Sequence, residues 1–293
     1  MKKTLEAVFI VLFICAGLYA CIDTSKNETE QTTINETIEK TEENNKKEQI
    51  AAEKTTFELG EVYNDNGIII TATYADEEMM KFEIQNNTEK EYEVYVYPEA
   101  INNTMEKFKM LAVVENISRG KKTIVEVDLK TEKQYEKIKS FSFVFSFYEK
   151  NGSAISFMEF ETMPIVIKSN NYDENYEYMG HQMLYDENGI EIGGVEINND
   201  YVEISIINKS DNYYKYNIRN TSINEYSYDV NENGFAYVYD ERIFSHCQDI
   251  LRINYEYFTK ENDIDVNQFG FVLTFSDIEG NVKFETETIT IKK

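Results

Sequence analysis

Histidine, cysteine and recognisable catalytic motifs are scarce in this chain, which limits the chemistry it can carry out. The only histidines are His181 and His246, and the cysteines are Cys15, Cys21 and Cys247. Hydrolysis and group transfer need an activated nucleophile, a positioned base or a metal ion. The sequence has no Gly-rich phosphate loop and no GxSxG, HExxH or CxxC motif. We therefore expect no catalytic residue, metal or cofactor. The remaining enzymatic alternative is a hydrolase that uses a pair of carboxylates, because Asp and Glu are plentiful.

His246 and Cys247 are neighbours, yet we do not expect them to act together. Adjacent side chains of a strand point to opposite faces, which excludes a Cys–His dyad there. If residues 240–251 form a short helix instead, Cys247 shares an apolar face with Ile243 and Leu251 and is a small core residue.

Positive charge is also in short supply. The chain has 29 Lys and Arg against 54 Asp and Glu, a formal charge of −25. Removing residues 1–20, with two lysines and one glutamate, changes this to −26. Such a field repels nucleic acid and attracts cations. We therefore expect no nucleic-acid partner, and we expect any protein, peptide or cell-wall ligand to be cationic.

Tryptophan is absent and proline occurs twice, whereas the chain has 22 Tyr and 18 Phe. The absence of Trp disfavours a carbohydrate-binding platform. Tyrosine forms good contact surface at low entropic cost, and it gathers in YDENYEY at 172–178 and DNYYKYN at 211–217. The alternative is that tyrosine simply covers solvated strands. As candidate binding residues we name Tyr176, Tyr178, Tyr213, Tyr214 and Tyr216.

The first 21 residues have the order of an export signal. Two lysines precede an apolar run, and Leu18-Tyr19-Ala20-Cys21 resembles a bacterial lipobox, whose cysteine receives a diacylglyceryl thioether after cleavage before it. The apolar run is shorter than an uncleaved membrane helix needs. Ordinary cleavage after Gly17 and lipidation at Cys15 are the remaining alternatives. We expect residues 1–20 to be a lipoprotein signal peptide and Cys21 to anchor the protein to the outer face of the cytoplasmic membrane.

Residues 21–55 have few apolar side chains and no aromatic ones. Such a composition cannot bury enough surface to offset the entropy of ordering, so we expect a disordered tether. Once Cys15 is removed and Cys21 is acylated, Cys247 is the sole free thiol, and no intramolecular disulfide can form.

The remaining sequence contains a tandem repeat. Residues 63–102 align with 185–224 without a gap, and ten of the forty positions are identical. The Phe-rich runs that begin at Phe141 and Phe269 then match at an offset of 128. Order and spacing are kept across separate blocks, as expected for a duplication. We set the repeats at 56–168 and 177–293, joined by a linker at 169–176.

Each repeat has the pattern of an all-β domain. Asn-Gly at 66–67 and 188–189 predicts a tight hairpin turn, and runs that alternate apolar and polar residues follow it. The acidic turns lack the EF-hand spacing of calcium ligands, so we interpret them as turns. Seven or eight short strands in about 110 residues predict a β-sandwich. The predicted strands are 80–86, 92–97, 123–129 and 140–152, then 202–208, 214–218, 251–258 and 269–277.

Both repeats share an Asn-x-Thr/Ser strand end at Asn86 and Asn208, a long Phe-rich strand and a closing I-x-I-K. In this order of motifs they resemble the telokin-like, immunoglobulin-related domains of Gram-positive surface lipoproteins. The resemblance implies two tandem immunoglobulin-like β-sandwiches, and it brings no catalytic residues. We expect a non-enzymatic, lipid-anchored binding module. An accessory lipoprotein that docks a membrane protein during envelope assembly or stress is the alternative.

Overall fold

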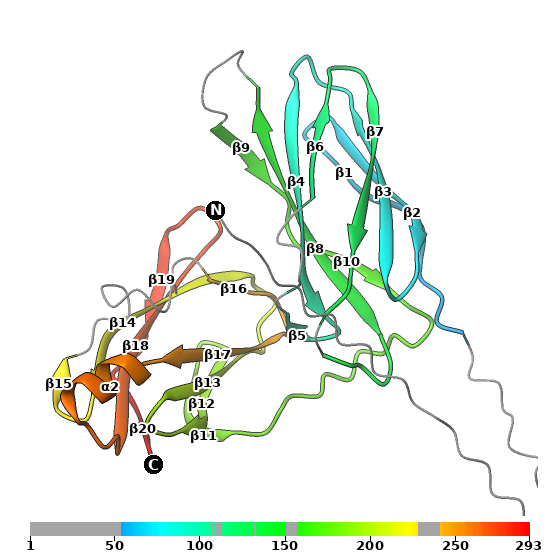
Figure 1. Ribbon diagram of the computed structural model, residues 1–293. Coiled ribbons are helices and arrows are strands. Elements are labelled where there is room, and N and C mark those ends of the chain that lie inside the picture. The colour runs from blue at the N-terminus through cyan, green and yellow to red at the C-terminus, as the bar shows by residue number, and fades with distance from the viewer. Residues whose placement is uncertain (1–53, 107, 109–112, 132, 151–156, 228–240) are drawn as a thin grey trace, which may run out of the picture. The chain divides into compact units, whose positions relative to one another are not determined.

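The computed structural model describes residues 54–293, except 107, 109–112, 132, 151–156 and 228–240. Residues 54–293 form one compact unit. The expected signal peptide, the lipid site Cys21 and tether residues 22–53 lie outside the described residues. Of the helices in the described part, none is long and apolar enough to cross a membrane. The described chain is all-β and contains twenty strands and one short helix (Figure 1).

Ten strands belong to each repeat. The first repeat contains β1 (Gly60–Asp65), β2 (Ile68–Ala75), β3 (Met79–Asn86), β4 (Tyr92–Ile101), β5 (Thr104–Met105), β6 (Val113–Ile117), β7 (Lys122–Asp128), β8 (Ser140–Glu149), β9 (Phe157–Glu161) and β10 (Ile165–Lys168). The second contains β11 (Gln182–Glu187), β12 (Ile190–Ile197), β13 (Tyr201–Asn208), β14 (Tyr214–Ile223), β15 (Tyr226–Ser227), β16 (Glu241–Ile243), β17 (Gln248–Asn254), α2 (Glu256–Asn262), β18 (Gln268–Ser276), β19 (Val282–Glu285) and β20 (Ile289–Lys292).

The strands of each repeat pair in the same way. In the first repeat, β1-β2-β3-β7 form one antiparallel sheet, while β4 pairs with β8 and β6, and β8 pairs with β10 and β9. In the second repeat, β11-β12-β13-β17 correspond to the first set, and β14, β16, β18, β19 and β20 to the other. The parallel pairing of Thr104 in β5 with Gln248 in β17 joins a sheet of one repeat to a sheet of the other.

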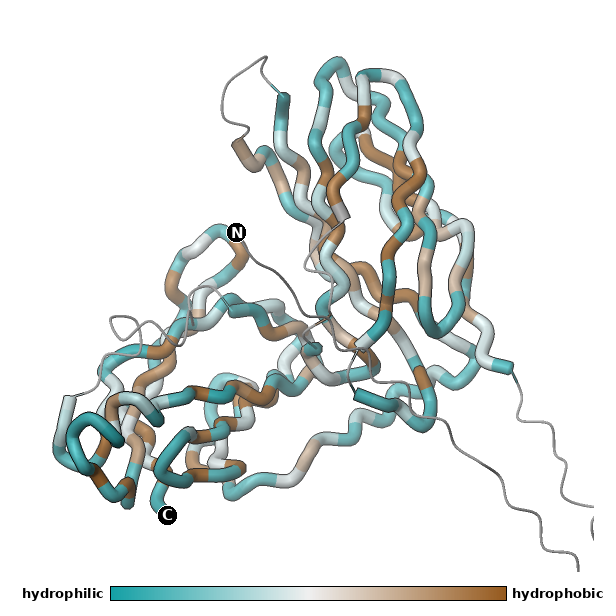
Figure 2. Tube along the Cα trace, viewed as in Figure 1, coloured by the Kyte–Doolittle hydropathy of each residue, from teal (hydrophilic) through white to brown (hydrophobic). Residues whose placement is uncertain are grey.

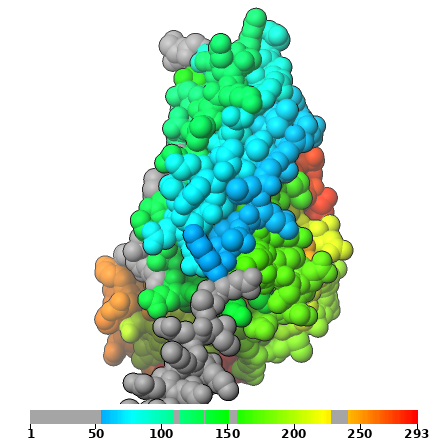
Figure 3. All heavy atoms as spheres, turned by 90° about the vertical axis from the view of Figure 1, so that its right-hand side faces the viewer, coloured from blue at the N-terminus to red at the C-terminus, as the bar shows by residue number. Residues whose placement is uncertain are grey.

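Each repeat has its own cluster of buried apolar side chains between its sheets. In the first repeat the cluster draws on both sheets, for example on Phe82 of β3 and Phe143 of β8, both fully buried. Hydrophobic and hydrophilic residues alternate along the strands in Figure 2, as a sheet with one buried face requires. In the view of Figure 3, the opening strands of the first repeat, in blue and cyan, cover much of the visible face. The architecture is therefore β-sandwich-like.

Matched side-chain contacts show the internal symmetry in detail. Tyr92, Phe147 and Phe160 form a cluster in which the phenylalanine rings stack at 4.6 Å. Tyr214, Phe275 and Phe284 repeat it, with the phenylalanines at 4.8 Å. The hairpin turns match too, because Asn66 and Asn188 both have positive φ (52° and 57°) and a glycine follows each. The two halves of the described chain thus share these side-chain contacts and turns.

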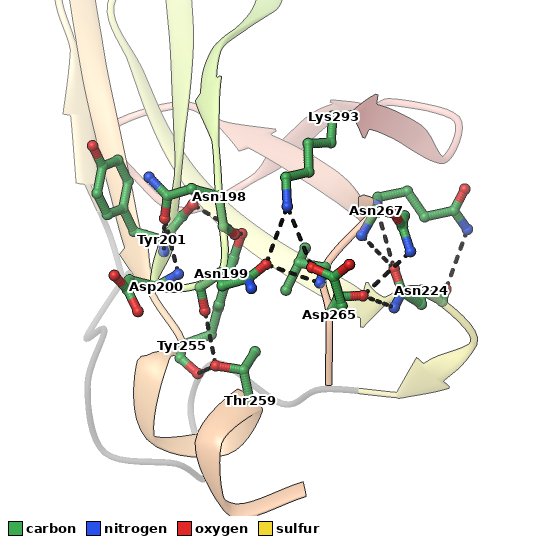
Figure 4. A network of polar contacts seen from close by, with 12 residues as sticks. Asn198, Asn199, Asp200, Tyr201, Asn224, Tyr255, Thr259, Asp265, Asn267 and Lys293 are labelled. Carbon is green, nitrogen blue, oxygen red and sulfur yellow. Dashed lines mark hydrogen bonds and ion pairs between the residues drawn. The ribbon is translucent and has the colours of Figure 1, made fainter. Parts of the chain in front are cut away.

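The helix α2 is the main feature without a counterpart in the described residues of the first repeat. Its Thr259 hydroxyl donates to the carbonyl of Asn199 (2.8 Å), and the Asn199 side chain accepts from Lys293 (3.4 Å) and from the amide of Val266 (3.1 Å). Asn224 caps the start of β18 by accepting from the amides of Asn267 and Gln268, the latter at 3.1 Å. Figure 4 shows this network, which fixes α2 and the chain end to the sandwich.

Two expectations from the sequence are wrong in part. The alternative helix at 240–251 does not form: β16 and β17 flank a tight turn at Phe244–Cys247. The strand expected at 251–258 ends at Asn254, and α2 begins at Glu256. Tyr255 is buried and its hydroxyl donates to two carbonyl oxygens of the β12–β13 region, each at 2.8 Å. The aromatic residue that suggested a longer strand is therefore a core side chain at the helix start.

Candidate functional site

The tyrosines expected on a binding surface are mostly core residues. Tyr216 is 0% exposed, Tyr213 5% and Tyr214 8%, so the expectation that these three form an exposed contact surface is wrong. Tyr214 and Tyr216 project inward because alternate residues of β14 face the core. The Tyr216 hydroxyl is satisfied by the Asp249 carboxylate. Tyr176 remains 40% exposed, and Tyr178 is half-buried.

A cavity of about 230 Å³ lies where the two repeats meet, and two of these tyrosines line it. The first repeat provides the chain that follows β4, the start of β8 and the segment at β10, and the second provides the β16–β17 turn and the start of β14. The lining residues are Asn102, Asn103, Ser140, Ser142, Met163, Pro164, Val166, Tyr172, Tyr176, Asp211, Tyr213, Phe244, Ser245, His246 and Cys247.

The wall from the first repeat is fixed by Asn102. This residue has φ 58°, which lets its side-chain oxygen accept hydrogen bonds from the amides of Lys139 (2.6 Å) and Ser140 (3.3 Å). The contact ties the end of β4 to the beginning of β8. Asn103 connects this wall to the second repeat: its carbonyl accepts from the amide of Gln248 (2.7 Å), and its side chain donates to the carbonyl of Glu177 (2.7 Å).

The wall from the second repeat is a turn that differs strongly between the repeats. In the first repeat, residues 118–121 are Ser-Arg-Gly-Lys and are exposed; in the second, 244–247 are Phe-Ser-His-Cys. Both turns close with the same backbone hydrogen bond, 3.1 Å in the first repeat and 3.2 Å in the second. His246 adopts φ 56° where the first repeat has Gly120 at φ 66°. A left-handed conformation is strained for histidine, and such strain is typical of functional positions.

His246 is held from three sides. Its Nε2 lies 2.9 Å from the Asp211 carboxylate, and its ring stacks on Tyr176 with centroids 4.8 Å apart and planes 10° apart. The Tyr178 hydroxyl donates to the His246 carbonyl (3.5 Å). The imidazole therefore has a fixed orientation, and the Tyr176 ring is fixed with it.

The cavity wall includes two residues with buried polar groups, the Cys247 thiol and the Tyr213 hydroxyl. Burial raises the pKa of the Cys247 thiol to about 12, so at neutral pH it is protonated and poorly nucleophilic. The Tyr213 hydroxyl is buried and has no hydrogen-bond partner among the described atoms, and burial raises its pKa. An unsatisfied buried hydroxyl is unfavourable, because the cost of removing it from water is not offset by a hydrogen bond.

A partly buried ion cluster connects the two repeats near the same junction. Arg242 of β16 contacts Glu99 of β4 (3.1 Å) and Glu161 of β9 (2.8 Å), and its guanidinium lies over the Tyr97 ring. Burial, opposed by Arg242 and reinforced by Glu161, raises the pKa of Glu99 to about 7. Both carboxylates are engaged by one arginine and neither lines the cavity, so we assign them a structural role.

The second histidine lies apart from the cavity. The His181 side chain is buried, with its Nε2 2.9 Å from Glu191, which also contacts Lys209. A side chain at Gly193 would collide with the His181 ring, so this glycine makes room for it. Within the described residues, His, Cys, Asp and Glu side chains form no group of three suited to a metal ion.

The sequence showed several of these residues but not the cavity. The repeat alignment carried a usable signal, since Tyr214 aligns with Tyr92 and Tyr216 with Val94, and both first-repeat residues are buried. The replacement of Ser-Arg-Gly-Lys by Phe-Ser-His-Cys was visible as well. No known protein family's model matches this chain, and no curated protein matches it.

Proposed function

We propose that this chain is a lipid-anchored surface protein with two immunoglobulin-like β-sandwiches, and that it binds a partner rather than catalysing a reaction. The observation that carries the binding role is the junction cavity. Both repeats build it, and the Cys247 thiol on its wall is protonated at neutral pH. A concave, mostly apolar site with a few polar groups is the usual form of a ligand site.

The strand pairing supports the immunoglobulin-like assignment. One sheet of the first repeat contains β2-β3-β7 and the other β6-β4-β8-β10. The chain crosses between the sheets after β3 and after β7, as it does after strands B and E of that fold. The conserved disulfide and tryptophan of antibody domains have no equivalent, and Phe82 with Phe143 and Phe145 fills the space between the sheets.

The anchor rests on the sequence, with Cys21 in a lipobox-like context and a polar tether behind it. We expect Cys21→Ala to release the protein from the membrane fraction into the medium, or to leave an uncleaved precursor. Normal processing and retention of this variant would contradict the anchor.

The binding role is tested on intact cells. We expect crosslinking to the wild-type protein to capture a partner, and we expect Tyr176→Ala to reduce that capture. Tyr226→Ala, which changes a more exposed tyrosine outside the cavity (57% against 40% for Tyr176), serves as the control. Equal capture by both variants would remove the cavity from the proposed function.

A further inference from the structure

The size of the junction cavity limits what it can hold. About 230 Å³ is the space of roughly seven or eight water molecules at about 30 Å³ each. This volume accommodates one long side chain or a similar group, and it is smaller than the pockets that enclose whole ligands. The cavity is therefore suited to one group that projects from a larger partner.

The cavity walls suit the aliphatic part, or stem, of a long side chain. Met163, Pro164 and Val166 form an apolar strip from the first repeat, and Met163 and Val166 are exposed. Tyr172, Tyr176 and Phe244 add aromatic rings. Methylene groups pack well against such a surface while a charged end stays in a polar place.

The aromatic and acidic residues suit a cation at the end of that stem. The Asp211 side chain is 98% exposed, and one of its carboxylate oxygens lies 2.9 Å from His246 Nε2. A tyrosine face attracts ammonium groups, and the cavity wall already shows this geometry, because Lys168 Nζ lies 4.3 Å from the centre of the Tyr172 ring. The net charge of −25 adds long-range attraction for a cation.

The second repeat adds a buried aromatic residue to the cavity wall. Tyr213 lines the cavity, is 5% exposed and has no hydrogen-bond partner among the described atoms. Its ring is held edge-on against Phe244 at 5.3 Å.

We propose that this cavity binds the side chain of a lysine in a peptide or protein partner. The aliphatic stem lies along Met163, Pro164 and Val166. The ammonium group is held by the Asp211 carboxylate, beside its contact with His246, and by the face of the Tyr176 ring opposite the one on which His246 stacks. This inference rests on the proposed binding role and names the chemical class of its ligand.

The test uses the full chain in a mild detergent, titrated by calorimetry with the capped tripeptide acetyl-Gly-Lys-Gly-amide. We expect saturable binding with a Kd on the order of 1 mM, as suits one side chain. The norleucine tripeptide has nearly the same stem without the charge, and we expect it to bind about tenfold more weakly or not at all. Raising the salt concentration from about 0.05 M to about 0.5 M is expected to weaken lysine binding, because exposed charges are screened.

Two variants separate a binding role from a structural one. His246→Gly installs the residue of the first repeat at a left-handed position, so the turn keeps its backbone while the support of Tyr176 and Asp211 is lost. We expect its melting temperature to be unchanged or higher and its lysine affinity to fall about fivefold or more. Asp211→Asn is expected to weaken lysine binding and leave norleucine binding unchanged, whereas Asp186→Asn at the exposed second hairpin turn is the control without effect.

Equal affinities for the lysine and norleucine peptides would overturn the proposal, as would the absence of saturable binding up to about 10 mM. If the lysine peptide fails while Tyr176→Ala still reduces capture on cells, the proposed function stands and the ligand class is wrong. If the peptide binds but cells yield no partner, the cavity assignment stands and the proposed function loses its support.

Discussion

Asn86 and its counterpart Asn208 each hold a tight turn together from inside the core. The Asn208 amide donates to the carbonyl of Asn212 (2.7 Å), and its oxygen accepts from the Ser210 amide (3.0 Å) and hydroxyl (2.7 Å). Asn86 makes the same three contacts with Lys90 and Thr88, at 2.8, 2.9 and 2.7 Å. Both side chains are fully buried, so no water can replace these bonds.

Asn208→Ala is therefore expected to lower the free energy of unfolding by about 2–3 kcal/mol, because it leaves a buried donor and acceptors unsatisfied. Asn86→Ala is expected to cost a similar amount. The control is Asn87→Ala, next to Asn86 but exposed, with an effect within about 0.5 kcal/mol. Urea unfolding measures all three, and equal stability of the Asn208 and Asn87 variants would show that the turn does not depend on this amide.

Tyrosine shows how far single residues could be predicted. The sequence indicated strands from β-branched and aromatic residues, and most of these strands are present. The sequence could not show which tyrosines face the core, because tyrosine is compatible with both a buried and a solvent-exposed face of a strand. For Tyr214 and Tyr216 the alignment with Tyr92 and Val94 would have decided it. The alignment would not have shown that Tyr213 is buried, because the aligned residue of the first repeat is Glu91. Tyr213 is buried at the junction between the repeats, which the alignment does not show.

At the scale of the elements, the strands could be predicted from the sequence, but the contacts between strands of different repeats could not. Local alternation and Asn-Gly turns determine each strand and hairpin. The pairing of β5 with β17 and the cavity bring together residues more than a hundred positions apart. No local pattern encodes such contacts, so the candidate site became visible only in the structure. The helix α2 was missed because Tyr255 and Phe258 fit a strand pattern equally well.

The ion cluster between β4, β9 and β16 predicts a pH dependence of stability. The pKa of Glu99 is about 7 in the folded protein, against 4.5 for a free glutamate, because burial disfavours its charge. The folded state therefore binds this proton more tightly, and the resulting stabilisation is complete below about pH 4.5 and lost as the pH rises through about 7.

Glu99→Gln should remove this contribution and still accept a hydrogen bond from Arg242. Between pH 5 and pH 8 we expect the wild type to lose about 2 kcal/mol more stability than the variant. Glu174→Gln deletes an equal charge at an exposed site and is expected to follow the wild type. Parallel curves for Glu99→Gln and the wild type, from urea unfolding at each pH, would show that Glu99 ionises normally.

At the scale of the whole molecule, the two repeats depend on the junction to different degrees. All members of the first repeat's apolar cluster lie between Phe57 and Ile167. The cluster of the second repeat also includes Ala100 and Val144 from the first. Phe244 and Cys247 are buried at the junction, where the first repeat has exposed Ser118 and Lys121. The second repeat thus buries apolar surface that the first repeat helps to cover.

We therefore expect residues 56–168 and 177–293 each to fold when expressed alone, with β-type circular dichroism and a cooperative melt. The second repeat should melt at a lower temperature than in the full chain, because part of its junction surface becomes exposed. Phe244→Ser, which installs the first repeat's residue, should destabilise the full chain by about 3 kcal/mol and the isolated repeat by clearly less. An equal cost in both would mean that Phe244 packs within its own repeat alone. Failure of either fragment to fold would mean that the two cores form one interdependent domain, and that the boundaries at 168 and 177 are wrong.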